Sequence, residues 1–252
     1  MENDLLLISG ADIPFAAAGL TIHVPRIKEI AYIGEKNFFS GCELLKFSKS
    51  NLILSSQDKD NLENQTDFDI IMSIINDKTN NAQLKESVLS AIMVLSLIFP
   101  NYKIKIDKQK IILTKEGEDN EHIIDNNNYQ IFRDILISMF CLTNKKTEQD
   151  NYNPGGPLAS KIAEKLKRGK AKVAQQKGDN TKISVLSKFA SILSVGEGKD
   201  LNSLMNYTVY QLFDEFERYN LKNSYDIYIK SKFAGATGMD EPDNWMIDIH
   251  KK

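Results

Sequence analysis

The amino-acid sequence predicts an α+β fold that is mostly α-helical, in which N-terminal helices accompany a small antiparallel β-hairpin and the C-terminal part is all-α. Three observations support this class. Apolar residues recur at three- and four-residue spacing over most of the chain, as they do on one face of an α-helix. An alternation of period two is confined to the stretch 102–113, as in a β-hairpin. Beyond the motif NPGGP at 153–157, the pattern is helical only.

Composition indicates an ordinary globular protein. Of its 252 residues, 42% are hydrophobic and 26% are charged, and the formal net charge is −2. This charge gives no overall attraction to nucleic acid or to an anionic membrane, so an electrostatic partner would have to bind a local patch. The N-terminus lacks the basic start of a signal peptide, and no run of 18 apolar residues occurs. We therefore expect a cytoplasmic protein without a membrane span.

The first elements are expected to be short. Extended pieces are predicted at Leu5–Ser9 and Leu20–Val24. A helix is expected after Pro25, because proline is favoured in the first turn and the apolar residues that follow share one face. A second helix is expected at Phe68–Ile75, beyond a polar stretch.

The segment Leu84–Phe99 is apolar on more than one face, so we expect a helix that is buried on most sides. One stripe comprises Leu84, Val88, Ile92, Leu95 and Phe99, and the other comprises Leu89, Met93 and Leu97. Pro100 ends this helix. The hairpin follows, with a third short strand expected at His122–Ile124 and Asp125 as the N-cap of a helix that reaches Phe140.

A polar, Pro/Gly-rich stretch marks the best domain boundary. The division predicted is an α+β domain at 1–143, a linker at 144–157, a helical domain at 158–238 and an acidic tail at 239–252. Within the helical domain, the expected helices span about 158–176, 182–195, 201–221 and 223–233.

The segment 158–177 is the most basic stretch of the chain, with seven lysines and arginines and one glutamate between 154 and 178. Its glycines lack the Lys-Ser/Thr that would complete a phosphate-binding loop. It has no aromatic residue to stack on bases, so nucleic acid is a secondary interpretation. Apolar residues every four positions, such as Ile162 and Leu166, instead predict a solvated cationic helix that docks on a protein partner.

No catalytic or metal-binding pattern accompanies these elements. The histidines His23, His122 and His250 are far apart in sequence, and no zinc, calcium or nucleophile-elbow motif occurs. We expect neither enzymatic activity nor a cofactor nor a metal. The two cysteines, Cys42 and Cys141, are expected to be free buried thiols.

The stretch 206–235 is rich in tyrosine and phenylalanine among charged residues, a composition typical of protein interfaces as well as of cores. The chain's one tryptophan, Trp245, lies in the acidic tail, as a candidate anchor on its own domain or on a partner. The residues we predict to bind a partner are Lys161, Lys165, Arg168, Lys172, Tyr210, Phe213, Phe216, Tyr219, Tyr225 and Trp245.

Several of these stretches together resemble a group of tail proteins of bacteriophages that infect Gram-positive bacteria, commonly regarded as tail assembly chaperones. The resemblance comprises HVPRIKEIAYIGE at 23–35, KIAEKLKRGKAKVAQQKG after the Pro/Gly linker, YTVYQLFDEFERYNLKNSYDIYIKSKFAG at 207–235 and the acidic DNWM at 243–246. It is strongest over about 154–250 and at 22–36. It carries no active-site motif.

The resemblance implies a non-enzymatic assembly factor in the host cytoplasm that binds the tape-measure protein, the tail-tube protein or both. Self-association is a further contact to test. The acidic tail is also expected to occupy the basic helix until a partner displaces it. One alternative is a structural tail or baseplate adaptor that stays in the virion. A second is a nucleic-acid-binding protein that uses 158–177, for which a salt-dependent shift of short DNA or RNA is the test.

Overall fold

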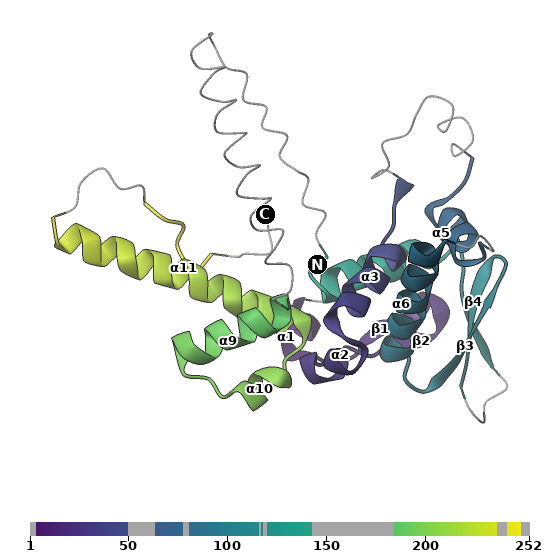
Figure 1. Cartoon of the computed structure of the whole chain (residues 1–252), viewed down its shortest axis with the longest axis horizontal. Coiled ribbons are helices and arrows are strands. Elements are labelled where there is room, and N and C mark those ends of the chain that lie inside the picture. Colours follow the sequence, from purple (N-terminus) through teal and green to yellow (C-terminus); the bar gives the residue numbers. More distant parts are fainter. Residues whose placement is uncertain are drawn as a thin grey trace, which may run out of the picture.

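The computed structural model describes residues 4–49, 64–77, 81–115, 117, 120–142, 184–235 and 241–247. These residues form an α+β fold in which helices predominate and two small antiparallel sheets lie among the N-terminal helices, as predicted (Figure 1). The basic segment 158–177 and the linker before it lie outside the described residues.

The chain begins with six short elements. These are α1 (Asp4–Ser9), β1 (Ile13–Phe15), the 3₁₀ turn η1 (Ala16–Ala18), β2 (Leu20–Ile22), α2 (Ile27–Ile33) and α3 (Glu35–Leu45). The extended piece expected at Leu5–Ser9 is wrong, because these residues form α1. A half-buried strand would bury alternate residues, whereas α1 buries only Leu7 and leaves Leu5 79% exposed. The strand β2 and the helix after Pro25 are as expected.

The next two helices, α5 (Asp67–Ile75) and α6 (Ala82–Ile98), are also where the periodicity predicted them. The expectation that α6 is buried on both stripes is wrong. Its buried side packs along α3, with Gly41 of α3 so close that an added Cβ would lie 2.3 Å from the Ser90 carbonyl oxygen. Of the second stripe, Leu89 is 57% exposed and Met93 is 40% exposed, whereas Leu97 is half-buried against the core.

The predicted hairpin and third strand form one antiparallel sheet, ordered β3-β4-β5. Its strands are Tyr102–Asp107, Lys110–Lys115 and Glu121–Ile124. The helix α7 (Tyr129–Met139) follows. It begins after Asn128 rather than Asp125, because the Asp125 carboxylate bonds the Asn127 backbone N–H in a turn that precedes the helix.

Three helices form the C-terminal part: α9 (Val185–Glu197), α10 (Leu201–Met205) and α11 (Val209–Phe233). The expected break near residue 222 is wrong, since α11 runs unbroken for 25 residues. The break occurs instead at Thr208, whose side chain accepts the Gln211 backbone N–H in a capping box. No glycine or proline occurs between Thr208 and the end of α11 at Phe233.

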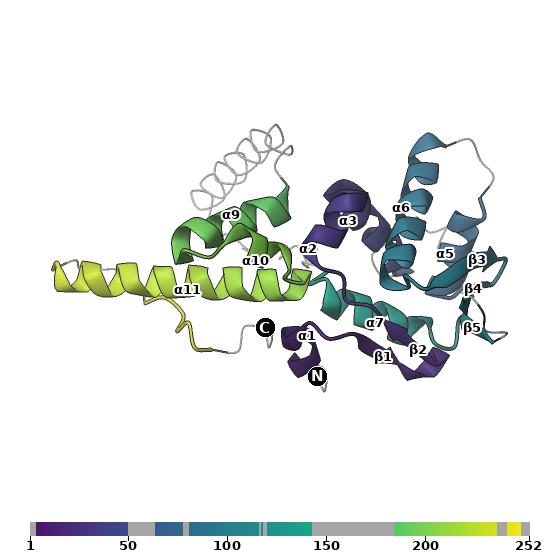
Figure 2. The same ribbon diagram turned by 90° about the horizontal axis from the view of Figure 1, so that it is seen from below.

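One continuous cluster of buried apolar side chains joins the two parts. Around α3, α6 and α7 it is built on aromatic rings, with the Phe38 and Phe140 centroids 4.8 Å apart in an edge-to-face pair. It extends to Leu193 on α9, Leu204 on α10 and Leu212 on α11, all fully buried. The first half of α11 therefore belongs to the body of the molecule, while Figures 1 and 2 show its second half running clear of the other helices.

Candidate protein-interaction surface

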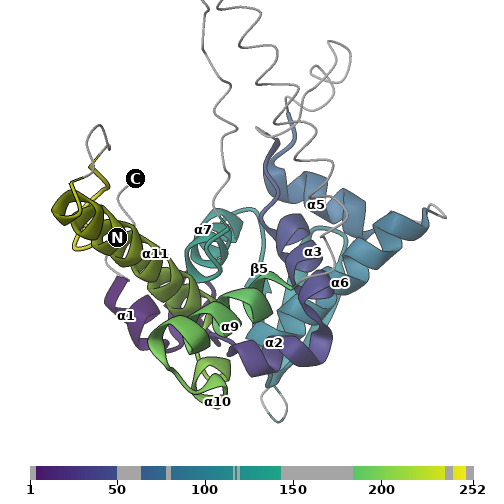
Figure 3. The same cartoon turned by 60° about the vertical axis from the view of Figure 1, so that its left-hand side comes forward.

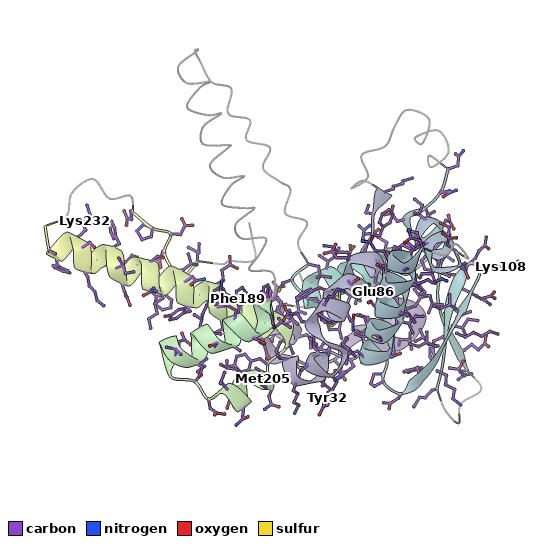
Figure 4. All side chains as sticks on the ribbon, in the orientation of Figure 1. Tyr32, Glu86, Lys108, Phe189, Met205 and Lys232 are labelled. Atoms are coloured by element: carbon purple, nitrogen blue, oxygen red, sulfur yellow. The ribbon has the colours of Figure 1, made fainter. Side chains whose placement is uncertain are left out.

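An aromatic cluster holds α11 against α9. The rings of Phe189 and Phe216 stack with centroids 3.7 Å apart and planes inclined by 10°, and Phe213 meets Phe189 edge-on at 5.0 Å. Tyr219 lies so close to Gly196 that an added Cβ there would be 2.4 Å from the tyrosine oxygen. Figure 4 shows Phe189 at this junction of α9 with α11. The cluster fixes the direction in which α11 leaves the body.

The segment 23–35 attaches the N-terminal part to this helical unit. The Ile27 backbone N–H donates to the Tyr207 carbonyl at 2.8 Å, just before α11 begins. The Glu35 carboxylate accepts the Val185 backbone N–H at 2.6 Å and also bonds the Ser184 hydroxyl, so it caps α9 from a distant part of the sequence.

A second set of bonds ties the segment 23–35 and α11 to the C-terminal end of α1 and to the glycine that follows it. The Arg26 guanidinium donates to the Gly10 carbonyl at 3.0 Å, and the Gln211 side-chain amide donates to the Ile8 carbonyl at 2.7 Å. Gly10 has φ +66°, and an added Cβ would lie 2.5 Å from the Arg26 guanidinium. A larger residue at this position would be strained in conformation and would also clash. Figure 3 shows α1 and α9 on either side of the start of α11.

The histidine at the start of segment 23–35 has a structural setting. The His23 Nδ1 lies 2.9 Å from an Asp12 carboxylate oxygen, and its Nε2 lies 3.3 Å from Glu29. The same Asp12 oxygen accepts the Val24 backbone N–H, and Glu29 accepts that of Arg26. The ring therefore links the strand β2 to the first turn of α2.

The second half of α11 carries an apolar face of its own, which we call the distal face. Its spacing follows a heptad pattern, so its members project from one side of the helix. It consists of Leu221, Tyr225, Tyr228 and Ile229, with the cations Arg218, Lys222 and Lys232 among them. The four apolar side chains are half-buried. Figure 4 shows Lys232 near the far end of α11, remote from the body.

The distal face lies opposite the side of α11 that packs on α9. Phe216 precedes Tyr225 by nine residues, or about two and a half helical turns, which places the two rings on opposite sides of the helix. Of the described helices, α9, α1 and α7 make the principal contacts with α11. The contacts with α1 and α9 that Gln211 and Phe213 make lie in the first half of the helix.

The tail segment 241–247 runs alongside this second half of α11 (Figures 1 and 2). An Arg218 guanidinium nitrogen of the helix donates to the Ile247 carbonyl at 3.5 Å. Arg218 belongs to the distal face, so the bond places the end of the segment on that side. Trp245 is 37% exposed, while its neighbour Met246 is 68% exposed. The segment also carries Glu241 and Asp243, and its described part is therefore acidic.

The residues predicted to bind a partner thus divide into four groups. Tyr210 is 4% exposed and belongs to the core. Phe213, Phe216 and Tyr219 are half-buried in the contact with α9, and Tyr225 and Trp245 lie in the second half of α11 and in the tail. The remaining four, Lys161, Lys165, Arg168 and Lys172, lie outside the described residues. Partner binding by all ten stays a prediction.

The sequence did not lead us to predict the residues of the distal face as one surface; of them, only Tyr225 was predicted to bind a partner. A heptad spacing that links Arg218, Tyr225 and Lys232 to Leu221 and Tyr228 was the signal available. Glu35 was not predicted either, because nothing in the local sequence indicates that a carboxylate will cap a helix that begins some 150 residues later.

The described residues contain no cluster of three or more histidine, cysteine or acidic residues arranged to hold a metal ion, and no helix long and apolar enough to cross a membrane. Cys42 and Cys141 are both free thiols, as expected; Cys42 is buried and Cys141 half-buried. Burial, reinforced by Asp214 and Glu217, raises the pKa of Cys141 to about 12.

Comparison with known proteins finds a similarity in the C-terminal part of the chain. A family model described as the YomV second domain matches residues 177–250, which contain α9, α10, α11 and the tail segment but less than half of the chain. No curated protein and no solved structure matches. YomV is a protein of a Bacillus phage region, and the match is consistent with a phage protein.

Proposed function

We propose that this chain is a non-enzymatic phage tail assembly chaperone, which binds the tape-measure protein, the tail-tube protein or both and keeps its client competent for assembly in the host cytoplasm. The observation that carries the proposal is the second half of α11. It extends from the body and presents apolar and aromatic side chains at helical spacing. The family match to a phage protein over the same residues supports it.

A tape-measure protein suits this surface because it is long and helical, with apolar stripes that stay exposed until tube subunits surround it. Exposed stripes of this kind promote aggregation unless another protein covers them. An amphipathic helix such as α11 can cover a stripe by helix-to-helix packing. Its contacts are spread over several half-buried residues rather than one deep pocket, so tube subunits can displace it.

The test is co-expression of the full chain with the tape-measure and tail-tube proteins of the same genome, followed by pull-down and by size-exclusion chromatography with light scattering. The expected result is that the chain keeps the tape-measure protein soluble and is absent from finished particles. Tyr225→Lys should reduce capture, whereas Ile227→Lys should not, because Ile227 is 53% exposed on the opposite side of α11.

Two results would contradict the proposal. Capture of neither protein by the folded wild-type chain would exclude the chaperone role. Presence of the chain in purified virions at a fixed copy number would instead make it a structural tail or baseplate adaptor.

A further inference from the structure

The composition of the second half of α11 favours a partner that covers the distal face. The second half of α11 contains Asn220, Asn223, Ser224, Asp226 and Ser231, all of them weaker helix formers than alanine or leucine. Short helices of such composition gain most of their stability from the packing of an apolar face. The Tyr228 ring has the Lys232 ammonium 5.4 Å from its centroid, which is a contact within the helix. Packing of the apolar face on a segment outside α11 would therefore add to the stability of this half of the helix.

The chemistry of the distal face specifies that segment. The cations Lys222 and Lys232 alternate with the apolar side chains, while Arg218 is ion-paired with Asp214 at 3.1 Å, so an occupant that combines apolar and acidic residues is complementary to it. A basic occupant would place like charges against these cations. A purely apolar occupant would remove water from the cations without supplying a countercharge.

The tail segment 241–247 has this composition and lies in this position. Its sequence, EPDNWMI, has two carboxylates and a tryptophan, and Arg218 of the distal face donates to its last carbonyl. It contains no helix or strand, and it lies alongside α11 in Figures 1 and 2. Exposed ion pairs are individually weak, so a tail held in this way can be displaced.

We propose that the distal face is a docking site for an acidic peptide with an aromatic anchor, and that the chain's own tail is a competing ligand that occupies it in the free protein. Acidic and apolar segments of the client displace the tail when they bind. The identity of the displacing partner rests on the proposed function, whereas the contact between the tail and α11 does not.

The chain supplies its own probe, because Trp245 is its sole tryptophan. Acrylamide quenching of the full chain measures how far the tail covers that ring. Tyr225→Lys should release the tail and raise the quenching constant by about twofold to threefold, since Trp245 is 37% exposed when docked and would become fully exposed. Ile227→Lys places the same charge on the opposite side of α11 and should leave quenching unchanged. Circular dichroism checks that both variants remain folded.

A second experiment tests the charge complementarity without relying on Tyr225. A dye-labelled peptide of sequence EPDNWMI is titrated into full-length Trp245→Ala, whose own tail has lost its anchor. Binding should be tighter than to the wild-type chain, should weaken as salt rises, and should be lost in Trp245→Ala that also carries Lys222→Glu and Lys232→Glu.

The outcomes separate this inference from the proposed function. Unchanged quenching in folded Tyr225→Lys, or no peptide binding to Trp245→Ala, would overturn the docking site even if the chain captures its client. Increased quenching in Tyr225→Lys together with peptide binding would support the site even if no tail protein is captured. A dimer that dissociates in Tyr225→Lys would also overturn it, because a second copy would then be the occupant.

Discussion

Replacement of Phe216 by alanine tests whether the stacked aromatic cluster anchors α11 or serves only as a surface for partners. Phe216 stacks on Phe189 at 3.7 Å and is half-buried. A fully buried Phe→Ala change costs about 3–5 kcal/mol and a stacked pair contributes about 0.5–1.5 kcal/mol, so for a half-buried ring we expect a loss of about 2–3 kcal/mol.

Phe233 provides the matched control, since it is the same residue type on the same helix but is 89% exposed. Phe233→Ala should change stability by no more than about 0.5 kcal/mol. In thermal unfolding followed by circular dichroism, Phe216→Ala should lower Tm by about 4–12 °C for a chain of this size. A double-mutant cycle with Phe189→Ala should give a coupling of about 1 kcal/mol. Equal effects of Phe216→Ala and Phe233→Ala would refute the structural role of the cluster.

Three further predictions concern packing, capping and a thiol. Gly41→Ala should destabilise the protein by about 1–2 kcal/mol, since overpacking against the Ser90 backbone outweighs the gain in helix propensity, and urea unfolding measures this loss. Glu35→Ala should cost about 1–2 kcal/mol through the lost cap of α9, and Glu35→Gln, which keeps an acceptor, should cost less in the same assay. Because its pKa is raised from 9.0 to about 12, Cys141 should react with a disulfide reagent at pH 8 at least about a hundredfold more slowly than in urea, as read by peptide mass spectrometry. The same shift stabilises the folded chain below pH 9 and is lost as the pH rises towards 12, so Cys141→Ser should unfold less readily than the wild type in that alkaline range only.

Local sequence determined the type of most elements, because helix and strand periodicity reports which side of an element is apolar. The hairpin Tyr102–Lys115 and the helix Phe68–Ile75 were predictable in this way. Periodicity did not determine which apolar side would be covered. On α6 the outward stripe of Leu89 and Met93 reads the same in the sequence as the buried one, and only the position of α3 distinguishes them.

For the candidate site, too, some features could be predicted from the sequence and others depended on the tertiary structure. The aromatic content of 206–235 and the single tryptophan, Trp245, were visible in the sequence, and so were the charges of the tail. The tertiary structure decided that Phe216 would pack inward on α9 while Tyr225 faces the opposite way. It also decided that Glu35 would cap a helix far along the chain and that the described tail would lie along α11. The physical reason is that propensity and periodicity arise from neighbours a few residues away, whereas burial depends on which distant segment fills the space beside each face.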